Sequence, residues 1–348
     1  MATFTAPLIG VLVGCGYSGD LQLSAWSRIE AARIAAVSSL HRTDAEQCAR
    51  KHGVPEVFDG FIEMLDKVQP DFVDIATPPE THLKLVTAAA ERGIQVLCQK
   101  PMATSPEEVN SMIVACEKHG TTLTINENAR FQPWFREIKK ILDAGTLGHI
   151  RSLRIASRAR LTLPRPDFGA QGHLADASQL AIMELGVHHL DTARYLLGEP
   201  DLVFAIAQHA SSHVIGEDTA LIVTRHGGAV STIDISWASP PWPPEQTQIT
   251  WSEVRIEGDD GIVNLSYDGL LEVVTDAESS RIRFPAEGIA QGYESMQRHF
   301  IDSLLKGLQA ETSGQQMAHT MDLVFAAYES AEHGVAVAPG NSPTIAVP

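Results

Sequence analysis

Two side chains that can move protons or stabilise negative charge stand in short, structured motifs of this chain. Lys100 follows an apolar segment in a Gln-Lys-Pro sequence, and His188 lies in a segment that reads as a helix. An ammonium group can donate a hydrogen bond to a reacting oxygen and stabilise the charge that develops there. An imidazole titrates near neutral pH and can take a proton from a hydroxyl group. These two residues are the first catalytic candidates.

Two carboxylates accompany His188 at helical spacing. Glu184 stands four residues before His188 and Asp191 three residues after it, so an α-helix would carry all three on one face. On that face Asp191 could orient the imidazole or bind a substrate hydroxyl, which makes it the third catalytic candidate. His189 points about 100° away around the helix and is given no role. The alternative for His188 is a core histidine satisfied by a backbone carbonyl.

This cluster does not have the pattern of a metal centre. Only His188 shares a face with a carboxylate, and no H-E-x-x-H or similar fixed motif occurs in the chain. The sequence therefore predicts chemistry without a metal ion.

A glycine-rich turn near the N-terminus is the clearest binding motif. Residues 14–19 (GCGYSG) follow the apolar run Leu8–Val13 and open a helical stretch, the context that dinucleotide binding requires. Gly14 permits the tight turn, Gly16 lets the backbone approach a pyrophosphate, and Gly19 lets helix and strand pack closely. The pyrophosphate would lie on free N–H groups at the positive end of the helix. NAD(P) is the predicted cofactor, and the alternative is a glycine turn without a ligand.

Further cofactor contacts follow from where strands are expected to end. In an open α/β sheet, ligands bind outside the carboxyl ends of the strands. Besides the three glycines, the candidates at these ends are Tyr17, Ser18, Ser39, Arg42, Thr77, Pro78, His82, Gln99 and Lys100.

The end of the second strand bears on the choice between NAD and NADP. An acidic residue about twenty positions past the glycines would accept both ribose hydroxyls, but this chain has Ser39 there, and Arg42 follows closely. No carboxylate at that position repels a 2′-phosphate. NADP is therefore slightly favoured, although Arg42 could equally be a solvated surface cation.

The first third of the chain alternates apolar and amphipathic segments, which predicts a doubly wound parallel sheet of the Rossmann type. The expected strands are Leu8–Val13, Ile34–Ser38, Phe72–Ala76, Gln95–Cys98 and Thr122–Ile125. The expected helices follow Gly19 and span Thr43–His52, Phe61–Lys67, Glu80–Arg92 and Pro106–His119.

The later part of the chain has consecutive strand-like segments, which predicts an α+β domain with a large, mostly antiparallel open sheet. These segments are 149–161, 203–208, 220–224, 230–237, 249–256 and 262–273, with helices from His188 to Leu197 and over 295–307 and 315–330. The expected domains are a dinucleotide-binding domain, 1–125, and a substrate-binding and oligomerisation domain, 126–348. The terminal helices could pack back on the first domain.

Composition argues against several classes of partner. The chain has 43 acidic and 26 basic residues, a formal net charge of −17, which disfavours nucleic acid and anionic membrane surfaces. No segment approaches the length needed to cross a bilayer. The four cysteines show no C-x-x-C spacing and the N-terminus has no signal-peptide pattern, so a reduced, cytoplasmic protein is expected.

Several motifs together resemble the Gfo/Idh/MocA family of sugar and cyclitol oxidoreductases. Besides the glycine turn they are residues 71–82 (DFVDIATPPETH), 96–102 (VLCQKPM), 130–134 (RFQPW), 184–191 (ELGVHHLD), 257–261 and 328–330. The resemblance implies that His188 is the catalytic base and that Glu184 contacts the sugar. It also shows two departures, because Gln99 stands where the family has glutamate and Glu184 where it has aspartate. The Gln-Lys-Pro form further resembles one sugar dehydrogenase branch.

Other polar and aromatic residues are secondary candidates. Arg130 and Arg165 could clamp polar substrate groups, since guanidinium groups suit oxygen-rich ligands, or they could form surface salt bridges. Trp134 and Arg194 are further candidates. Trp237, Trp242 and Trp251 could stack on a sugar, but core or oligomer packing is the more common use of such residues.

The predicted function is hydride transfer between a nicotinamide cofactor and a sugar, polyol or cyclitol hydroxyl or carbonyl. Two alternatives stay open: a glycosidase that works through transient oxidation and elimination, and a dinucleotide-binding regulator without catalysis. The alternating, aromatic-bearing strands from Ala220 to Val273 predict a homodimer or homotetramer interface.

Overall fold

The computed structural model describes residues 4–240 and 248–340. The chain divides into two compact units, Met1–Phe131 with Ala290–Met321, and Gln132–Ile289 with Asp322–Pro348. Residues 126–131 and most of the penultimate helix thus belong to the first unit. The division falls inside the last helix, α9 (Gly314–His333).

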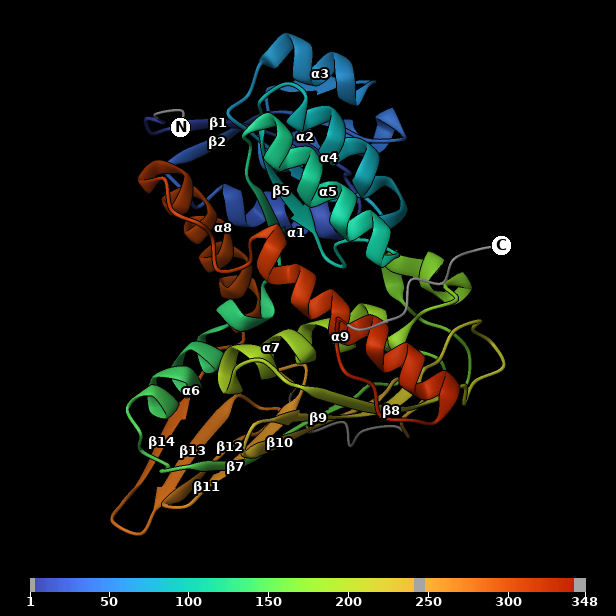
Figure 1. The fold of residues 1–348 in the computed structure, drawn as a ribbon. Helices are drawn as coiled ribbons and strands as arrows, with labels where there is room; N and C mark the ends of the chain where they lie inside the picture. The colour runs from blue at the N-terminus through green and yellow to red at the C-terminus, as the bar shows by residue number, and fades with distance from the viewer. Residues whose placement is uncertain (1–3, 241–247, 341–348) are drawn as a thin grey trace. The chain divides into compact units, whose positions relative to one another are not determined.

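The first unit contains a six-stranded sheet in which every neighbouring pair is parallel (Figure 1). The strand order is β3-β2-β1-β4-β5-β6, so the chain reverses direction across the sheet between β1 and β4, where doubly wound folds bind their ligands. This confirms the predicted Rossmann sheet. The strands are β1 (Leu8–Val13), β2 (Ala32–Ser38), β3 (Glu56–Phe58), β4 (Phe72–Ile75), β5 (Gln95–Gln99) and β6 (Leu123–Asn126).

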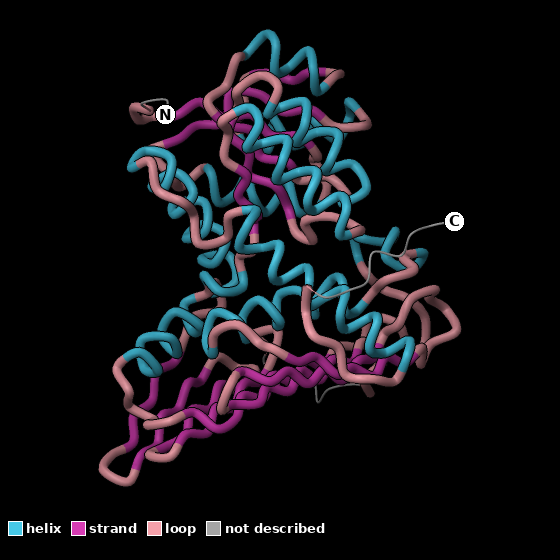
Figure 2. The backbone as a smooth tube through the Cα atoms, in the orientation of Figure 1, coloured by secondary structure: helices cyan, strands magenta, loops and turns pink. Residues whose placement is uncertain are grey.

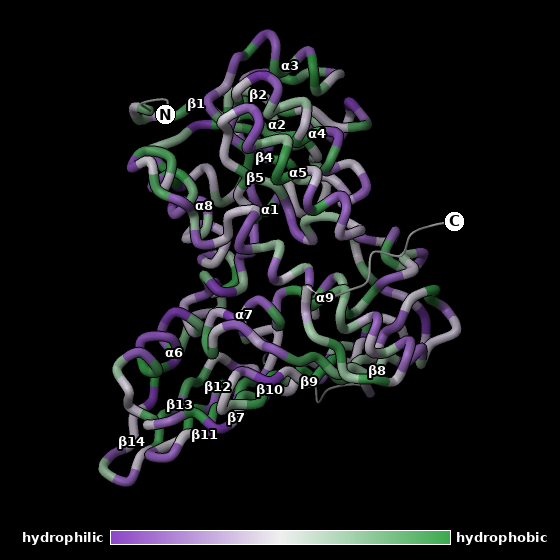
Figure 3. Tube along the Cα trace, viewed as in Figure 1, coloured by the Kyte–Doolittle hydropathy of each residue, from purple (hydrophilic) through white to green (hydrophobic). Residues whose placement is uncertain are grey.

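Helices and apolar side chains cover this sheet. Phe72 of β4 packs its ring 5.0 Å from Trp26 and 5.5 Å from Phe300, and the apolar strands are green in Figure 3. None of the described helices, in either unit, is long and apolar enough to span a membrane. The helices that contribute to this unit are α1 (Tyr17–Trp26), α2 (Arg42–His52), α3 (Phe61–Val68), α4 (His82–Ala90), α5 (Pro106–His119) and α8 (Gly288–Lys306).

The second unit contains an eight-stranded sheet in the order β14-β13-β12-β11-β7-β10-β9-β8 (Figure 2). Only the β7–β10 pair is parallel, which confirms the expected mostly antiparallel sheet. Helix α7 (Val187–Leu197) contacts β10, and α6 (Pro133–Asp143) precedes the sheet. The strands are β7 (Ile150–Arg158), β8 (Leu202–Gln208), β9 (Thr219–His226), β10 (Ala229–Ser236), β11 (Glu253–Gly258), β12 (Gly261–Leu265), β13 (Leu270–Thr275) and β14 (Ser279–Arg283).

Three features of the second unit and one of the first differ from the expected elements. The segment 262–273 is not one strand but the hairpin of β12 and β13, because Asp268-Gly269 turns the chain and Gly269 has φ +75°. Helix α6 and strand β14 in the second unit and strand β3 in the first were not expected. Trp242, with residues 241–247, lies outside the described residues.

Candidate active site

Of the three glycines in the turn after β1, one has open space beside its Cβ position and the other two have neighbouring atoms there. Gly14 has φ +98°, and a Cβ there would come 2.7 Å from the carbonyl group of Ala76. A Cβ on Gly19 would come 2.0 Å from the Gly14 oxygen, so these two glycines are required by packing. Nothing lies within 4 Å of the Cβ position of Gly16, which caps helix α1. The open space beside a helix N-terminus fits a pyrophosphate.

The remaining predicted contacts of this turn lie beside it. Tyr17 and Ser18 form the first residues of α1, and Tyr17 is exposed. The Gly14 N–H donates to the Ser38 carbonyl at the end of β2 (2.9 Å). The Ser39 hydroxyl lies 3.5 Å from the N–H of Cys15, so it faces the turn. The structure therefore gathers the predicted pyrophosphate and ribose contacts at the carboxyl ends of β1 and β2.

Arg42, the predicted phosphate contact at the start of α2, is held by two carboxylates. Its Nε lies 2.9 Å from Glu46 Oε1, and its Nη1 lies 2.7 Å from Asp59 Oδ1. Asp59, then Glu46, raise the pKa of the Arg42 guanidinium. A 2′-phosphate would have to share or displace these partners.

His82 links the two loops that follow β4 and β5. Its Nε2 lies 2.8 Å from the Thr77 carbonyl oxygen and its Nδ1 3.1 Å from that of Met102. The ring is fully buried, and burial lowers the pKa of His82. His82 was predicted as a cofactor contact, but this burial makes it a brace between loops. Thr77 and the exposed Pro78 stand at the carboxyl end of β4.

Lys100 is the residue after β5, at the same edge of the sheet. Its backbone N–H donates to Oε1 of the buried Gln99 (2.7 Å), and its own side chain is half-buried. Strand β5 neighbours β4, and β4 neighbours β1. The ends of these three adjacent strands thus carry Lys100, Thr77 and the glycine turn.

Helix α7 of the second unit carries His188 and Asp191, and both are buried. The His188 ring lies against Trp251, with ring centroids 5.0 Å apart and planes tilted by 36°. Asp191 Oδ1 lies 3.9 Å from Nη1 of the buried Arg194, which also pairs with Glu199. Trp251 is a site residue that the sequence did not distinguish from core tryptophans, because its contact with His188 joins segments far apart in the chain.

Glu184 stands in a helical turn of a different type from the one that carries His188. Residues Ile182–Gly186 form a π-helical turn, and α7 begins only at Val187. Glu184 and His188 are therefore joined across a π-helical turn, whereas His188 and Asp191 share the regular α-helical spacing within α7. Such turns occur often at functional sites.

The π-helical turn is braced from within its own unit. The Tyr328 hydroxyl donates to Glu217 Oε1 (2.8 Å) and accepts from the Met183 N–H (3.2 Å). The N–H of Ile182 donates to the same carboxylate (2.9 Å). These bonds hold the turn that carries Glu184.

His189 has a packing environment that differs from that of His188. Its Nε2 lies 2.7 Å from the Ser157 hydroxyl, and the ring is buried. Burial, and then the charge of His188, lower the pKa of His189 to about 3. His189 is therefore neutral at physiological pH.

The secondary candidates divide between buried and exposed positions. Arg130 is buried in the first unit, where its Nη1 lies 3.4 Å from the Glu311 carbonyl oxygen. Arg165 is exposed in the loop after β7. Trp134 packs against Phe284 (6.0 Å between centroids) as a core residue. Trp237 is likewise buried, against Phe168 (5.8 Å).

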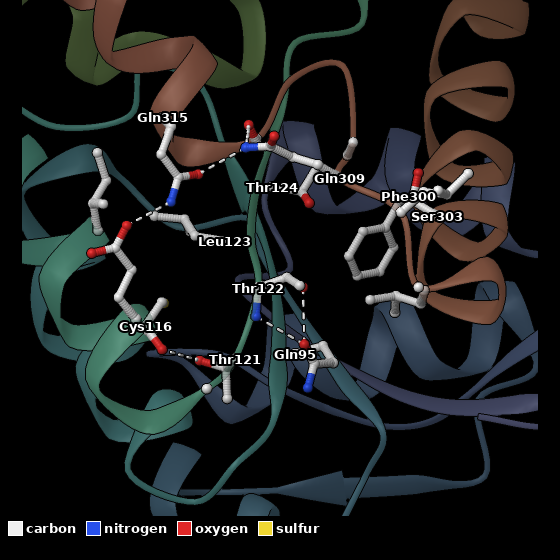
Figure 4. Close-up of a pocket in the computed structure, with 18 of the residues that line it drawn as sticks. Gln95, Cys116, Thr121, Thr122, Leu123, Thr124, Phe300, Ser303, Gln309 and Gln315 are labelled. Atoms are coloured by element: carbon white, nitrogen blue, oxygen red, sulfur yellow. Dashed lines mark hydrogen bonds between the residues drawn. The ribbon is translucent and has the colours of Figure 1, made fainter. Parts of the chain in front are cut away.

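A cavity of about 340 Å³ in the first unit lies at the other end of the strands (Figure 4). Its wall includes Gln95, the first residue of β5, and Thr122, which precedes β6. Gln95 Oε1 accepts hydrogen bonds from the N–H and hydroxyl of Thr122 (2.8 and 2.9 Å). Since cofactors bind at the carboxyl ends of such strands, this cavity is not the dinucleotide site.

One mixed cluster of possible metal ligands occurs among the described residues. Ligand atoms of Asp20, Cys48 and His52 all lie within 4.8 Å of one another. The Asp20 carboxylate already accepts from Lys51 (2.6 and 2.7 Å) and lies 2.9 Å from His52 Nε2. These ion pairs account for the cluster without a metal ion.

Comparison with known families matches both units. Residues 9–127 match "Oxidoreductase family, NAD-binding Rossmann fold", and residues 135–264 match "GFO/IDH/MocA C-terminal domain". Together these matches span more than half of the chain.

Individual relatives agree with this assignment. D-apiose dehydrogenase of Paraburkholderia graminis is 32% identical over 93% of this chain and 88% of its own. Myo-inositol 2-dehydrogenase of Thermotoga maritima is 27% identical over 93% and 96%.

Solved structures agree as well. An oxidoreductase from Agrobacterium radiobacter, in complex with NAD+, L-tartaric acid and magnesium, superposes with a TM-score of 0.88 at 30% identity, covering 95% of this chain and 98% of that one. A levoglucosan dehydrogenase complex, at 20% identity and a TM-score of 0.85, covers 95% and 99% and shares the fold. The chain therefore belongs to the Gfo/Idh/MocA family of NAD-binding oxidoreductases.

Proposed function

We propose that this protein is an NAD(P)-dependent dehydrogenase that oxidises a secondary or anomeric hydroxyl of a sugar, polyol or cyclitol, or reduces the matching carbonyl. The observation that carries the proposal is the position of Lys100. It lies at the carboxyl end of β5, in the same sheet edge as an open glycine cradle at Gly16. Relatives that act on apiose and inositol support the substrate class.

The roles of the catalytic residues follow from their chemistry. When bound, the nicotinamide cofactor accepts or supplies the hydride. Lys100 donates a hydrogen bond to the substrate oxygen and stabilises its negative charge. His188 takes the hydroxyl proton during oxidation and returns it during reduction. Asp191, whose charge is offset by Arg194, orients His188 or binds a neighbouring hydroxyl.

Other side chains contribute to holding both molecules. Glu184, Arg130 and Arg165 are proposed to contact substrate hydroxyls, and Trp251 restricts the His188 ring. The cofactor would be held by Gly14, Gly16, Tyr17, Ser18, Gly19, Ser39, Thr77, Pro78, Gln99 and Lys100, with His82 bracing the loops.

The function is tested by following nicotinamide absorbance with the purified protein. D-apiose, other aldoses, polyols and inositols are supplied with NAD and NADP separately. Turnover of one of these substrates supports the dehydrogenase. Release of an aglycone from a glycoside without net cofactor reduction would instead favour the redox-assisted glycosidase, and tight cofactor binding without any turnover would favour a regulator.

NADP is proposed as the slightly preferred cofactor, because Ser39 replaces the acidic ribose ligand and Arg42 stands nearby. Arg42→Ala is expected to weaken NADPH binding about two- to fivefold, since an exposed ion pair with a phosphate contributes about 1 kcal/mol or less. NADH binding should change little. Titration calorimetry with both cofactors measures this difference.

A matched control makes the same change of charge elsewhere on α2. Arg50→Ala removes a cation from the other end of α2 and should leave both affinities unchanged. Tighter binding of NADH than NADPH by the wild-type protein would contradict the preference. Equal losses for both cofactors in Arg42→Ala would contradict the phosphate contact.

We also propose a homodimer or homotetramer that pairs the outer face of the eight-stranded sheet. Exposed apolar side chains lie on the same face of this sheet, namely Ile206, Leu221, Val230 and Val274. In β9 and β10 they alternate with buried residues, so they face away from the core. A second copy of this chain would cover such a face.

Light scattering at micromolar concentration is expected to give the mass of two or four chains. Leu221→Glu with Val230→Glu should shift the mass toward one chain, because paired charges on an apolar interface oppose association. A wild-type protein with the mass of one chain would refute the interface.

A cytoplasmic location is also proposed, since Cys15, Cys48, Cys98 and Cys116 are all free thiols.

A further inference from the structure

A buried polar network lies under the carboxyl edge of the Rossmann sheet. It comprises Gln22 and Trp26 of α1, Asp74 of β4, Gln99 of β5 and Asn126 of β6, all buried. Polar groups at such depth are stable only when their hydrogen bonds are made with the correct donor facing each acceptor. The orientation of each amide in the network is therefore informative.

The orientation of the Gln99 amide is set by the backbone of Lys100. Gln99 Oε1 accepts from the Lys100 N–H at 2.7 Å. If the amide were turned over, its NH2 group would face that N–H, and two donors would meet. Gln99 must therefore direct its NH2 group the other way, toward Gln22.

The orientation of the Gln22 amide then follows. With its oxygen toward Gln99 Nε2 (3.0 Å), its NH2 group lies 2.5 and 2.7 Å from the two carboxylate oxygens of Asp74. The same NH2 group lies 2.8 Å from the Asn126 amide nitrogen, and turning the Asn126 amide would place its oxygen there as an acceptor. In this orientation the Asp74 carboxylate, the Gln22 amide and the Gln99 NH2 group are all paired. The result is a continuous relay from Asp74 through Gln22 and Gln99 to the Lys100 backbone.

This relay is fully paired when Asp74 is ionised. Trp26 Nε1 already donates to Asp74 Oδ2 at 2.7 Å, so a carboxylate meets donors from two sides. A proton on Asp74 Oδ1 would put an O–H donor against the Gln22 NH2 group 2.5 Å away, and would leave Oδ2 as the one acceptor for both Trp26 and Gln22. If Gln22 turned to accept that proton, its NH2 group would face the NH2 group of Gln99, and the relay would break there.

The surroundings of Asp74 determine the pH range in which its carboxyl group gains or loses a proton. Burial raises the pKa of Asp74 to about 7, and the hydrogen bond from Trp26 acts in the opposite direction. Among the described residues of β5, Cys98 interacts electrostatically with Asp74 from the opposite face of the sheet, because Asp74 pairs with Leu97 and Cys98 with Ile75. Burial and the Asp74 charge raise the pKa of Cys98 well above the usual thiol value. The other neighbours of Asp74, Gln22 and Trp26 on α1 and Asn126 on β6, do not titrate.

We propose that Asp74 is a positioning residue for Lys100, that it acts through Gln22 and Gln99, and that protonation of Asp74 switches this positioning off. The proposal rests on the proposed function, since it concerns the lysine assigned to the substrate oxygen. It also explains why residue 99 can be glutamine in this chain. The buried carboxylate at this edge of the sheet is that of Asp74 in β4, so residue 99, beside Lys100, need not supply one.

The test compares kcat of the wild-type enzyme and Asp74→Asn across pH. Asparagine presents one acceptor and one donor group, as a protonated aspartate does. The ratio of the two kcat values cancels titrations that both enzymes share. We expect this ratio to be near one at about pH 5.5 and to rise to about ten at about pH 8.5, the scale of one lost hydrogen bond to a charged group. A ratio that does not change with pH overturns the proposal.

Two further variants separate positioning from stability. Adding Gln99→Glu to Asp74→Asn returns a carboxylate to the relay and should recover most of the lost kcat. Asp71→Asn is the matched control, since Asp71 accepts from the Ile9 N–H (2.7 Å) before β4 begins. That control should shift the melting temperature without changing the pH dependence of kcat. A double variant no more active than Asp74→Asn overturns the relay.

An infrared measurement tests the switch independently of turnover. Wild-type minus Asp74→Asn difference spectra, recorded with NADP bound, should contain a protonated-carboxyl band that disappears as pH rises through about 7. Failure of the proposed function leaves this band in place while no sugar is turned over. Absence of the band at every pH overturns the proposal even in an active enzyme.

Discussion

His188→Asn is expected to lower kcat by about 10²- to 10⁴-fold, the usual contribution of a positioned general base. Asparagine keeps the approximate size and a polar end, but it cannot take the hydroxyl proton. Because His188 packs against Trp251 and is buried, the substituted side chain remains in the same position on α7. Steady-state kinetics with the wild-type and substituted enzymes should show the lower kcat.

His189→Asn is the matched control for this substitution. His189 is adjacent in sequence and buried, but its ring contacts Ser157 and stays neutral. Its loss should lower the melting temperature and leave the pH profile of kcat unchanged. A His188→Asn enzyme within a few-fold of wild type would show that His188 is a packing residue and that the base lies elsewhere.

Lys100→Ala is expected to reduce kcat by about 10²- to 10³-fold, as removal of one donor to a developing negative charge does in other enzymes. Both kcat and kcat/KM should decrease by this factor, because the hydrogen bond from Lys100 strengthens as negative charge develops on the substrate oxygen. Cofactor affinity should stay within a few-fold of wild type, since the glycine turn is intact. Single-turnover absorbance and calorimetry measure the two quantities separately.

Lys84→Ala provides the comparison, because Lys84 is an exposed lysine of the same unit on α4. It removes the same charge and should leave kcat unchanged. Lys100→Arg should restore only part of the activity, since a guanidinium fork places its donors differently from an ammonium group. Full activity of Lys100→Ala would refute the assignment of the substrate-oxygen contact.

The sequence by itself determined the cofactor half of this protein to a large extent. The turn at residues 14–19 needs glycines for local reasons, since Gly14 has a positive φ and Gly19 abuts the turn's own backbone. Strand β1 and helix α5 were predicted with the bounds that the structure has, because each has a clear apolar pattern and clear ends. For α5 the Ser105 hydroxyl caps the helix by accepting from Glu108 N–H.

Only the tertiary structure decided the features that depend on contacts between distant segments. The π-helical turn at Glu184 is braced by Tyr328 and Glu217, which are far away in the chain. Trp251 became part of the site through its contact with His188. Asp74 reads in sequence as one residue of a buried strand. The role proposed for Asp74 depends on amides of α1 and β5, because the direction of each hydrogen bond in a buried network is set by all the members of the network together.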